Sequence, residues 1–231
     1  MPTLADTVSE LLTRDEPVLF LDTCILLDIV RATYRCLGTT VADASEIRRA
    51  LGTSPPSVSL VLASWIFTEW QNNITVTQND VAKHLESIQD QSNHFYEACQ
   101  ALGVSLSFTK PDFKTANLHQ LLHDLSKELL ECSISVDDDA TCTLRGHTRA
   151  KQGLPPSIKG REVKDCVILE TCLEVTRQLR SAGFSRPCVF CTSNTKDYGK
   201  PEEGRIPEFS DASLNLVFTT TLSWARSQLT T

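Results

Sequence analysis

The chain has 231 residues, of which 41% are hydrophobic, and it carries a formal net charge of −7. This length can bury one sizeable core, so we expect a single domain over residues 1–231 that carries an insertion. The acidic charge argues against a protein that coats nucleic acid through general positive charge. It does not exclude a nuclease, because an acidic metal site would contribute several of these charges.

The cysteines and the apolar runs indicate an intracellular protein. Nine cysteines, an odd number, lie mostly inside apolar runs, and no cationic segment followed by an apolar stretch opens the chain. No apolar run approaches the ~18–20 residues that a membrane-spanning helix needs. We therefore expect reduced thiols, a cytoplasmic location and no membrane partner.

The first third of the sequence alternates between predicted helices and strands. Leucine and valine residues at helical spacing predict a short amphipathic helix over residues 4–12. The continuous apolar run 18–21 predicts a strand that helices cover on both faces. The next predicted elements are a helix over 43–52, a strand over 58–63 and a helix over 65–72.

Residues from about 78 to 150 predict an all-helical insertion. Apolar residues at helical spacing run from Val81 to Leu102, and a second such stripe runs from Leu118 to Leu130. Three consecutive acids at 137–139 either cap the following helix or are solvated. A lid over the functional site and a dimer surface are both open as roles for this insertion.

The segment 145–164 is basic and irregular. It carries six Lys or Arg residues against one acid, Glu162, and Gly153-Leu154-Pro155-Pro156 interrupts it, so we expect a loop or a short helix and a loop. A helix is predicted over 165–179, followed by strands over 187–192 and 214–218. Strands that alternate with helices predict an α/β fold with a central parallel sheet.

Four acids lie at strand-to-helix junctions or at the starts of helices. Asp22 closes the run 18–21, Glu69 follows the second strand, Asp165 opens a helix and Asp197 follows the third strand. The carboxyl ends of parallel strands share one edge of the sheet, where ligands usually bind. We therefore predict that these four acids form an all-oxygen site for one or two Mg²⁺ or Mn²⁺ ions.

Further residues are candidates for binding a substrate at such a site. Thr192 and Asn194, which precede Asp197, are expected to orient a water molecule or a substrate phosphate. The basic segment leads directly into Asp165, so its cations are candidates for a clamp on nucleic-acid phosphates. These cations are Arg149, Lys151, Lys159, Arg161 and Lys164.

The four acids and their surroundings resemble the motifs of PIN-domain nucleases, especially of the larger PIN-like members. Leu19-Phe20-Leu21-Asp22-Thr23-Cys24 resembles the strand-ending Asp of the family, and Glu69 resembles the Glu on its second helix. Gly160-Arg161-Glu162-Val163-Lys164-Asp165 resembles a Gly-x4-Asp motif, and residues 189–197 resemble the strand with a Thr/Ser, Asn and Asp cluster. The ordered set, from about residue 18 to 217, carries the resemblance.

This resemblance implies a PIN-like three-layer α/β/α fold and metal-dependent hydrolysis of phosphodiester bonds, with Asp22, Glu69, Asp165 and Asp197 as catalytic residues. It implies an endoribonuclease that acts on single-stranded or structured RNA and leaves a 5′-phosphate and a 3′-hydroxyl. Relatives often form homodimers, and many small ones are toxins paired with an inhibitory antitoxin protein. The long insertion departs from these small toxins and argues against a toxin role.

Several alternatives remain at this point. An isolated Asp after a strand is commonly a helix cap, and Glu162 competes with Glu69 as the fourth acid. The chain could also be a catalytically inactive PIN-fold binding or scaffold protein whose insertion contacts a partner. A phosphatase of the haloacid-dehalogenase type would need a second Asp where Cys24 stands, and Cys188 and Cys191 lack the further ligands of a zinc site.

Overall fold

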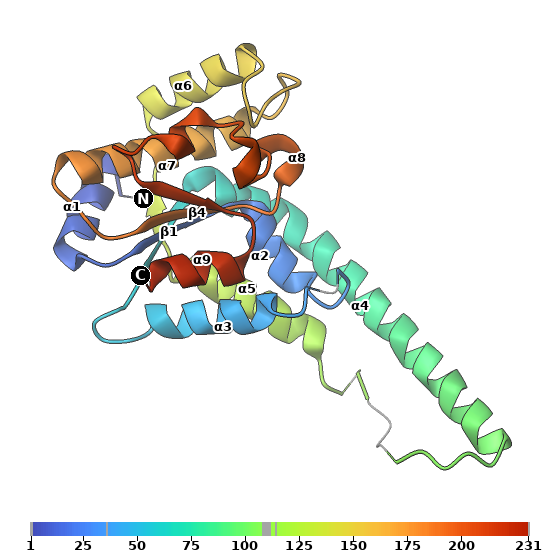
Figure 1. Cartoon of the computed structure of the whole chain (residues 1–231). Coiled ribbons are helices and arrows are strands. Elements are labelled where there is room, and N and C mark those ends of the chain that lie inside the picture. The colour runs from blue at the N-terminus through green and yellow to red at the C-terminus, as the bar shows by residue number, and fades with distance from the viewer. Residues whose placement is uncertain (1, 36, 108–111, 114, 231) are drawn as a thin grey trace.

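The computed structural model describes residues 2–35, 37–107, 112–113 and 115–230. Within these ranges, five strands form one sheet between two layers of helices (Figure 1). Helices α1 (Leu4–Arg14) and α7 (Val163–Ser181) cover one face, while α3 (Thr40–Leu51), α5 (Leu118–Glu131) and α9 (Leu222–Leu229) lie on the other. This arrangement confirms the predicted PIN-like three-layer α/β/α fold.

The remaining helices surround this framework. Helix α2 packs against α4 and α5, and α6 packs against the outer side of α7. Asp139, from the acidic triplet, caps α6 by accepting hydrogen bonds from the N–H groups of Thr141 and Cys142 at 2.9 Å. The bounds are α2 Thr23–Val30, α4 Ser64–Ala101, α6 Ala140–Lys151 and α8 Thr195–Tyr198, with the 3-10 helices η1 Pro201–Glu203 and η2 Pro207–Ser210.

All strands of the sheet run parallel, in the order β3-β2-β1-β4-β5. Strands β1, β2 and β4 are buried along their whole length, because helices cover both of their faces. The chain moves outward from β1 to β2 and β3, and it then returns to the other side of β1 for β4 and β5. The strand order therefore reverses between β1 and β4, and such switch points are where open α/β sheets bind ligands. The bounds are β1 Val18–Leu21, β2 Ser59–Ala63, β3 Ile134–Val136, β4 Cys188–Cys191 and β5 Leu216–Thr219.

The predicted insertion over residues 78–150 is not helical throughout. Residues 134–136 form β3, which pairs in register with β2 and extends the sheet. Three residues are too few to show the alternating pattern that identifies a strand in a sequence. Pairing with β2 therefore determines this strand, and the pattern of its own residues does not.

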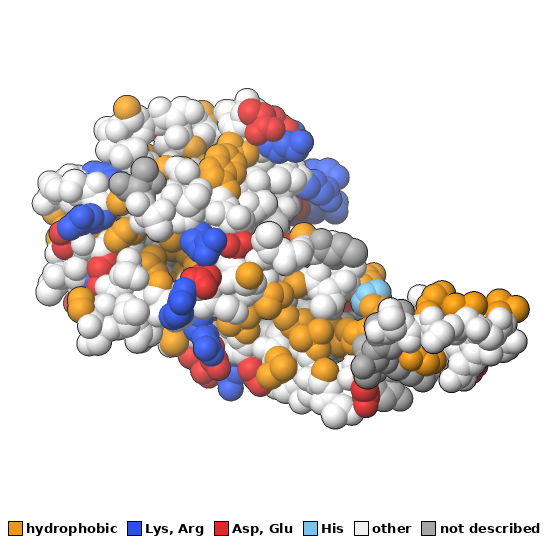
Figure 2. Space-filling model, turned by 60° about the horizontal axis from the view of Figure 1, so that its bottom comes forward, with side chains coloured by type: hydrophobic (Ala, Val, Ile, Leu, Met, Phe, Trp, Pro, Cys, Tyr) orange, Lys and Arg blue, Asp and Glu red, His pale blue; other side chains and the backbone are white. Residues whose placement is uncertain are grey.

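The helices predicted over residues 65–72 and from residue 79 onward belong to one helix, α4, of 38 residues. Polar residues at 73 and 77–80 interrupt the apolar stripe, but no Gly or Pro in this stretch ends the helix. Figure 1 shows that the C-terminal half of α4 leaves the body of the protein and projects as an arm. Figure 2 shows hydrophobic side chains on the arm and on the body beside it; Val76 and Phe95 of α4 are exposed. In the described part of the chain, α4 included, no helix is both long and apolar enough to span a membrane.

Candidate functional site

Asp22 lies at the switch point between β1 and β4. It follows Leu21, which pairs in register with Cys191, and its backbone N–H donates to the Cys191 carbonyl at 3.0 Å. Its buried carboxylate accepts the Thr23 N–H at Oδ1 (2.8 Å) and the Thr192 hydroxyl at Oδ2 (2.6 Å). Asp22 is therefore the cap of α2 and also the central acid of this edge of the sheet.

Asp22 is held by side chains that follow β1 and β4. The Thr192 hydroxyl donates to Asp22 and accepts the Asn194 N–H at 3.1 Å. The Cys24 thiol donates to Asp22 Oδ2 at 3.1 Å and accepts the Ser193 N–H at 3.2 Å. Burial, and then the charge of Asp22, raise the pKa of the Cys24 thiol well above its usual value, so the thiol keeps the proton that it donates.

Glu69 reaches the site from the first part of α4. The Thr23 hydroxyl donates to Glu69 Oε2 at 2.7 Å, while the N–H of the same residue donates to Asp22. Thr23 thus connects two carboxylates that come from different strand-to-helix junctions. Burial raises the pKa of Asp22, hydrogen bonds from Thr192 and Cys24 lower it, and the negative charge of Glu69 raises it.

Asp165 lies in the first turn of α7 and is half-buried. Its pKa is raised to about 8, first by burial and then by the negative charges of Asp22, Glu69, Asp197 and Glu162, in decreasing order. These mutual effects indicate that the four predicted acids lie near one another. Glu162, the alternative fourth acid, is also among the neighbours that raise the pKa of Asp165.

Asp197 lies in α8, directly after the loop that follows β4. The side-chain amide of Asn194 donates to Asp197 Oδ2 at 2.9 Å. The predicted orienting residues, Thr192 and Asn194, therefore contact the carboxylates of Asp22 and Asp197. The hydroxyl of Tyr198 donates to the Asp165 carbonyl at 3.2 Å and so connects α8 to α7.

The four acids have no cationic partner in the part of the chain that the structure describes. No Lys, Arg or His there forms an ion pair with Asp22, Glu69, Asp165 or Asp197. As the described side chains stand, no three His, Cys, Asp or Glu residues come close enough together to hold a metal ion. The donor chemistry still fits a hard divalent cation, because the oxygens are carboxylates, and burial followed by the neighbouring negative charges raises the pKa of Asp165.

A supporting network behind the site was missed by the sequence analysis. Asp28 of α2 is buried and accepts the Ser193 hydroxyl at Oδ2 (2.6 Å) and the Arg35 guanidinium at Oδ1 (2.7 Å). This network holds the loop after β4 against α2. The available signal was a lone acid in the otherwise apolar stretch 25–30, because such an acid needs a partner.

Most of the predicted phosphate-binding cations lie on the surface near α7. Lys151, Lys159, Arg161 and Lys164 are exposed, and none of them forms an ion pair within the described residues. The Lys164 ammonium lies 5.5 Å from the ring centre of Trp65, which is four residues before Glu69 on α4. The segment itself is α6 followed by a loop, in agreement with the prediction of a short helix and a loop.

Arg149 was predicted to bind phosphate with the other cations of this segment, but its side chain is buried. Its Nε donates to Glu170 Oε1 at 2.8 Å, its Nη1 donates to the Pro155 carbonyl at 3.0 Å, and its Nη2 pairs with Glu208. A buried guanidinium requires such partners. Arg149 therefore joins α6, α7 and η2, and it does not belong to a nucleic-acid clamp.

Comparison with known proteins places this site in a family. A family model described as a PIN domain matches residues 19–198, well over half of the chain, and these residues hold all four acids. Neither the curated proteins nor the solved structures contain a match to this sequence. The ordered strands, the switch-point acids and the matched residues agree, so the chain belongs to the PIN-domain family, whose members are generally nucleases.

Proposed function

We propose that this protein is a metal-dependent endoribonuclease that uses Mg²⁺ or Mn²⁺ to hydrolyse phosphodiester bonds. The observation that carries this proposal is the grouping of Asp22, Glu69, Asp165 and Asp197 at one sheet edge, where none of them forms an ion pair with a cation of the described residues. Carboxylates in a structural cluster are normally neutralised by Lys or Arg. A perturbed pKa among unneutralised acids at a ligand-binding edge is typical of a functional site.

In this proposal, Asp22 and Asp165 would be the main residues that hold the metal, and Glu69 and Asp197 would complete the site. The bound ion supplies a water molecule activated near neutral pH and a counter-charge for the phosphate oxygens. Hydrogen bonds from Thr192, Thr23 and Asn194 fix the orientations of Asp22, Glu69 and Asp197, respectively. Three of the four acids are therefore held by neighbours before any substrate arrives, which lowers the entropy cost of assembling the site.

The substrate backbone is expected to lie along the exposed cations that precede Asp165. Lys159, Arg161 and Lys164 are available for phosphate oxygens, and phosphate contacts of this kind position a nucleic acid without selecting its sequence. The choice of RNA rests on the resemblance of the motifs to the larger PIN-like nucleases. The predicted homodimer, inhibitory protein partner and cytoplasmic location stay predictions.

The test is cleavage of a mixed pool of single-stranded RNA and a matched pool of DNA, with Mg²⁺ or Mn²⁺ and then with EDTA. We expect metal-dependent cleavage of RNA that falls about 100-fold or more in Asp22→Asn and in Asp165→Asn, because metal-bound charge stabilisation contributes several kcal/mol to such reactions. Asp90→Asn, an exposed acid on α4, is the matched control and keeps full activity.

The same experiment separates the two candidate functions. Cleavage that survives unchanged in both Asn variants would come from another site or another protein, and it would remove these acids from the mechanism. A folded native protein that cleaves neither pool and binds no Mn²⁺ would support the alternative, an inactive PIN-fold binding or scaffold protein.

A further inference from the structure

A cavity of about 330 Å³ lies beside the acidic site, along the outer edge of β5. Its walls come from the segment that follows Asp197, from β5 and from α9. Tyr198 belongs to both places, because its side chain lines the cavity while its hydroxyl donates to the Asp165 carbonyl at 3.2 Å. Tyr198 therefore lies between the cavity and the acids.

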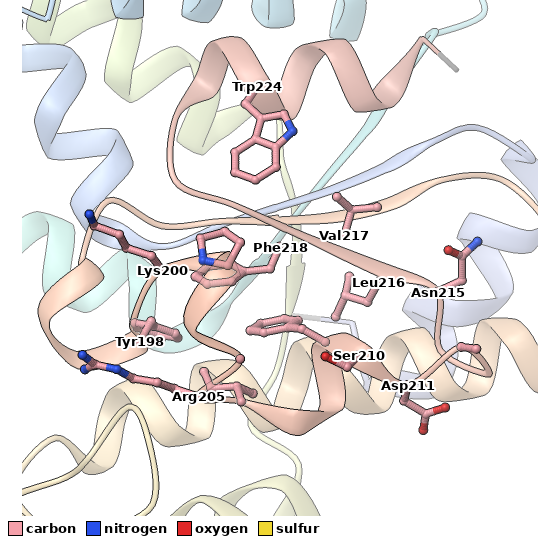
Figure 3. A pocket seen from close by; sticks show the side chains of 15 residues that line it. Tyr198, Lys200, Arg205, Ser210, Asp211, Asn215, Leu216, Val217, Phe218 and Trp224 are labelled. Atoms are coloured by element: carbon pink, nitrogen blue, oxygen red, sulfur yellow. The ribbon is translucent and has the colours of Figure 1, made fainter.

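Aromatic rings gather around this cavity, although aromatic residues make up only 6% of the sequence. The rings of Phe209 and Phe218 stack at 4.6 Å with an interplanar angle of 12°. The Trp224 side chain is 39% exposed, and Figure 3 shows its indole reaching from α9 toward Phe218. An exposed indole at the mouth of an aromatic cavity leaves a ring face that another planar group can cover.

One end of the cavity is cationic. Lys200 is exposed and forms no ion pair within the described residues, while Arg205 pairs with Glu203 at 2.5 Å. Figure 3 shows Lys200 and Arg205 at the end of the cavity where Tyr198 lies, with Asn215 and Asp211 at the opposite end. Gly199 has φ +81°, a conformation that favours glycine, and a Cβ there would lie 2.5 Å from Arg205 Cδ, so the Arg205 side chain would have to shift.

We infer that this cavity is a nucleobase subsite that takes one unstacked base of the nucleic-acid substrate. The base stacks against Trp224, and the phosphate beside it lies at Lys200, from where the strand continues to the acids. The cavity volume suits a ligand of nucleoside size. Aromatic faces combined with cations along the backbone path are the means by which proteins bind single strands.

This inference rests on the proposed function for the identity of the ligand, and it adds where a base binds. Residues 199–224, which form most of the cavity, follow the residues that the family model matches. A peptide strand added to the free edge of β5 would be a different occupant. The cations at the end nearest the acids favour the nucleic acid, because phosphate requires them and a peptide backbone does not.

The experiment measures the binding of a fluorescent 12-nucleotide single-stranded RNA in EDTA, with an abasic residue moved through the sequence one position at a time. Native protein should lose about 5- to 150-fold in affinity at one or two abasic positions and little elsewhere. This range is the affinity that stacking of one base on an aromatic side chain contributes. Trp224→Ala should lose a similar amount with the intact RNA and become insensitive to the abasic position. Trp224→Phe, which keeps a ring, should retain most of the affinity and the positional pattern.

Two further variants complete the design. Lys200→Ala should weaken binding at every abasic position and reduce the salt dependence, because it removes a phosphate contact. Phe95→Ala removes an exposed aromatic side chain from the α4 arm and should leave the binding pattern unchanged.

Equal sensitivity to abasic positions in native protein and Trp224→Ala would overturn the subsite, as would a β-strand peptide that displaces RNA while no abasic position matters. Because binding is measured without metal, its result is independent of cleavage. Metal-dependent cleavage without the abasic pattern would leave the nuclease intact and remove the subsite. The abasic pattern without cleavage would keep the subsite and remove the nuclease.

Discussion

Two clusters of acids in this protein differ in whether a cationic side chain neutralises their negative charge. Above α7, Glu170 and Glu208 share the guanidinium of Arg149, whose side chain is only 8% exposed. At the switch point, Asp22, Glu69, Asp165 and Asp197 have no cationic side chain among the described residues, and the pKa of Asp165 is raised to about 8. The first cluster carries its own counter-ion, whereas the second has none among the described residues, as the proposed metal site would require.

The difference separates a structural role from a functional one. A neutralised cluster ties elements together and loses stability when its cation is removed. A cluster without an internal cation lowers the stability of the free protein and gains stability from whatever neutralises it. The predictions below test each side of this comparison.

Removal of the internal cation should have the largest effect. Arg149→Met leaves Glu170 and Glu208 without their partner, and we expect a loss of about 3–5 kcal/mol in the free energy of unfolding. Urea denaturation followed by circular dichroism measures it. Arg145→Met removes the more exposed pair with Glu174 and should cost about 0–1 kcal/mol. Equal losses in the two variants would contradict the structural role of Arg149.

Addition of a divalent metal ion should have the next largest effect. Mg²⁺ or Mn²⁺ at about 100 times its dissociation constant should stabilise the native protein by about 2.7 kcal/mol. The melting temperature then rises by roughly 5–10 °C. Asp22→Asn should abolish most of this rise, and Asp90→Asn should keep it. A rise of the same size in all three proteins would show that the ion binds elsewhere.

Removal of the buried Asp165 charge should give a gain in stability that depends on pH. The folded pKa of Asp165, about 8, exceeds the unfolded value of about 3.9, so folding takes up a proton between these values. The stability that this protonation contributes is complete below about pH 4 and is lost as the pH rises through about 8. Without metal, Asp165→Asn should therefore have a higher melting temperature than native protein at pH 8, and the difference should shrink toward pH 4. A constant difference across this range would contradict the shifted pKa.

Loss of a surface cation should have the smallest effect. Lys164 lies over Trp65 near the acids without an ion pair in the described part of the chain, so we expect it to contact substrate. Lys164→Ala should weaken binding of single-stranded RNA a few-fold and reduce the slope of log affinity against log salt by about 0.7. Lys83→Ala, an exposed lysine on α4, should change neither quantity. Identical slopes in Lys164→Ala and native protein would remove Lys164 from the interface.

The positions of the acids could be predicted because they depend on local order. Asp22 and Asp197 follow apolar strands, and parallel strands bring their carboxyl ends to one edge whatever the loops between them do. The strand order, which places β1 beside β4, adds the neighbour contacts. The contact between Thr192 and Asp22 could not be predicted, because this hydrogen bond spans 170 residues and leaves no local signal in the sequence.

The features that were missed depend on distant contacts. Arg149 stands in a basic segment and looks like a surface residue, yet its partners Glu170 and Glu208 lie 21 and 59 residues away. Strand β3 exists because β2 offers an edge, and the cavity beside β5 exists because the stretch 198–224 folds back on itself around that strand. Local patterns specify elements, whereas pairing and burial between elements specify these features.

The central position of β1 has a consequence for how the site appears during folding. Strand β1 lies between two halves of the sheet. Strands β2 and β3 come earlier in the sequence, and strands β4 and β5 come later. A chain in which β4 is not yet paired with β1 holds Asp22 and Glu69 but lacks Thr192 and Asp197 beside them, because the Thr192 hydroxyl reaches Asp22 across 170 residues. The acidic site is therefore complete only when the two halves of the sheet have joined.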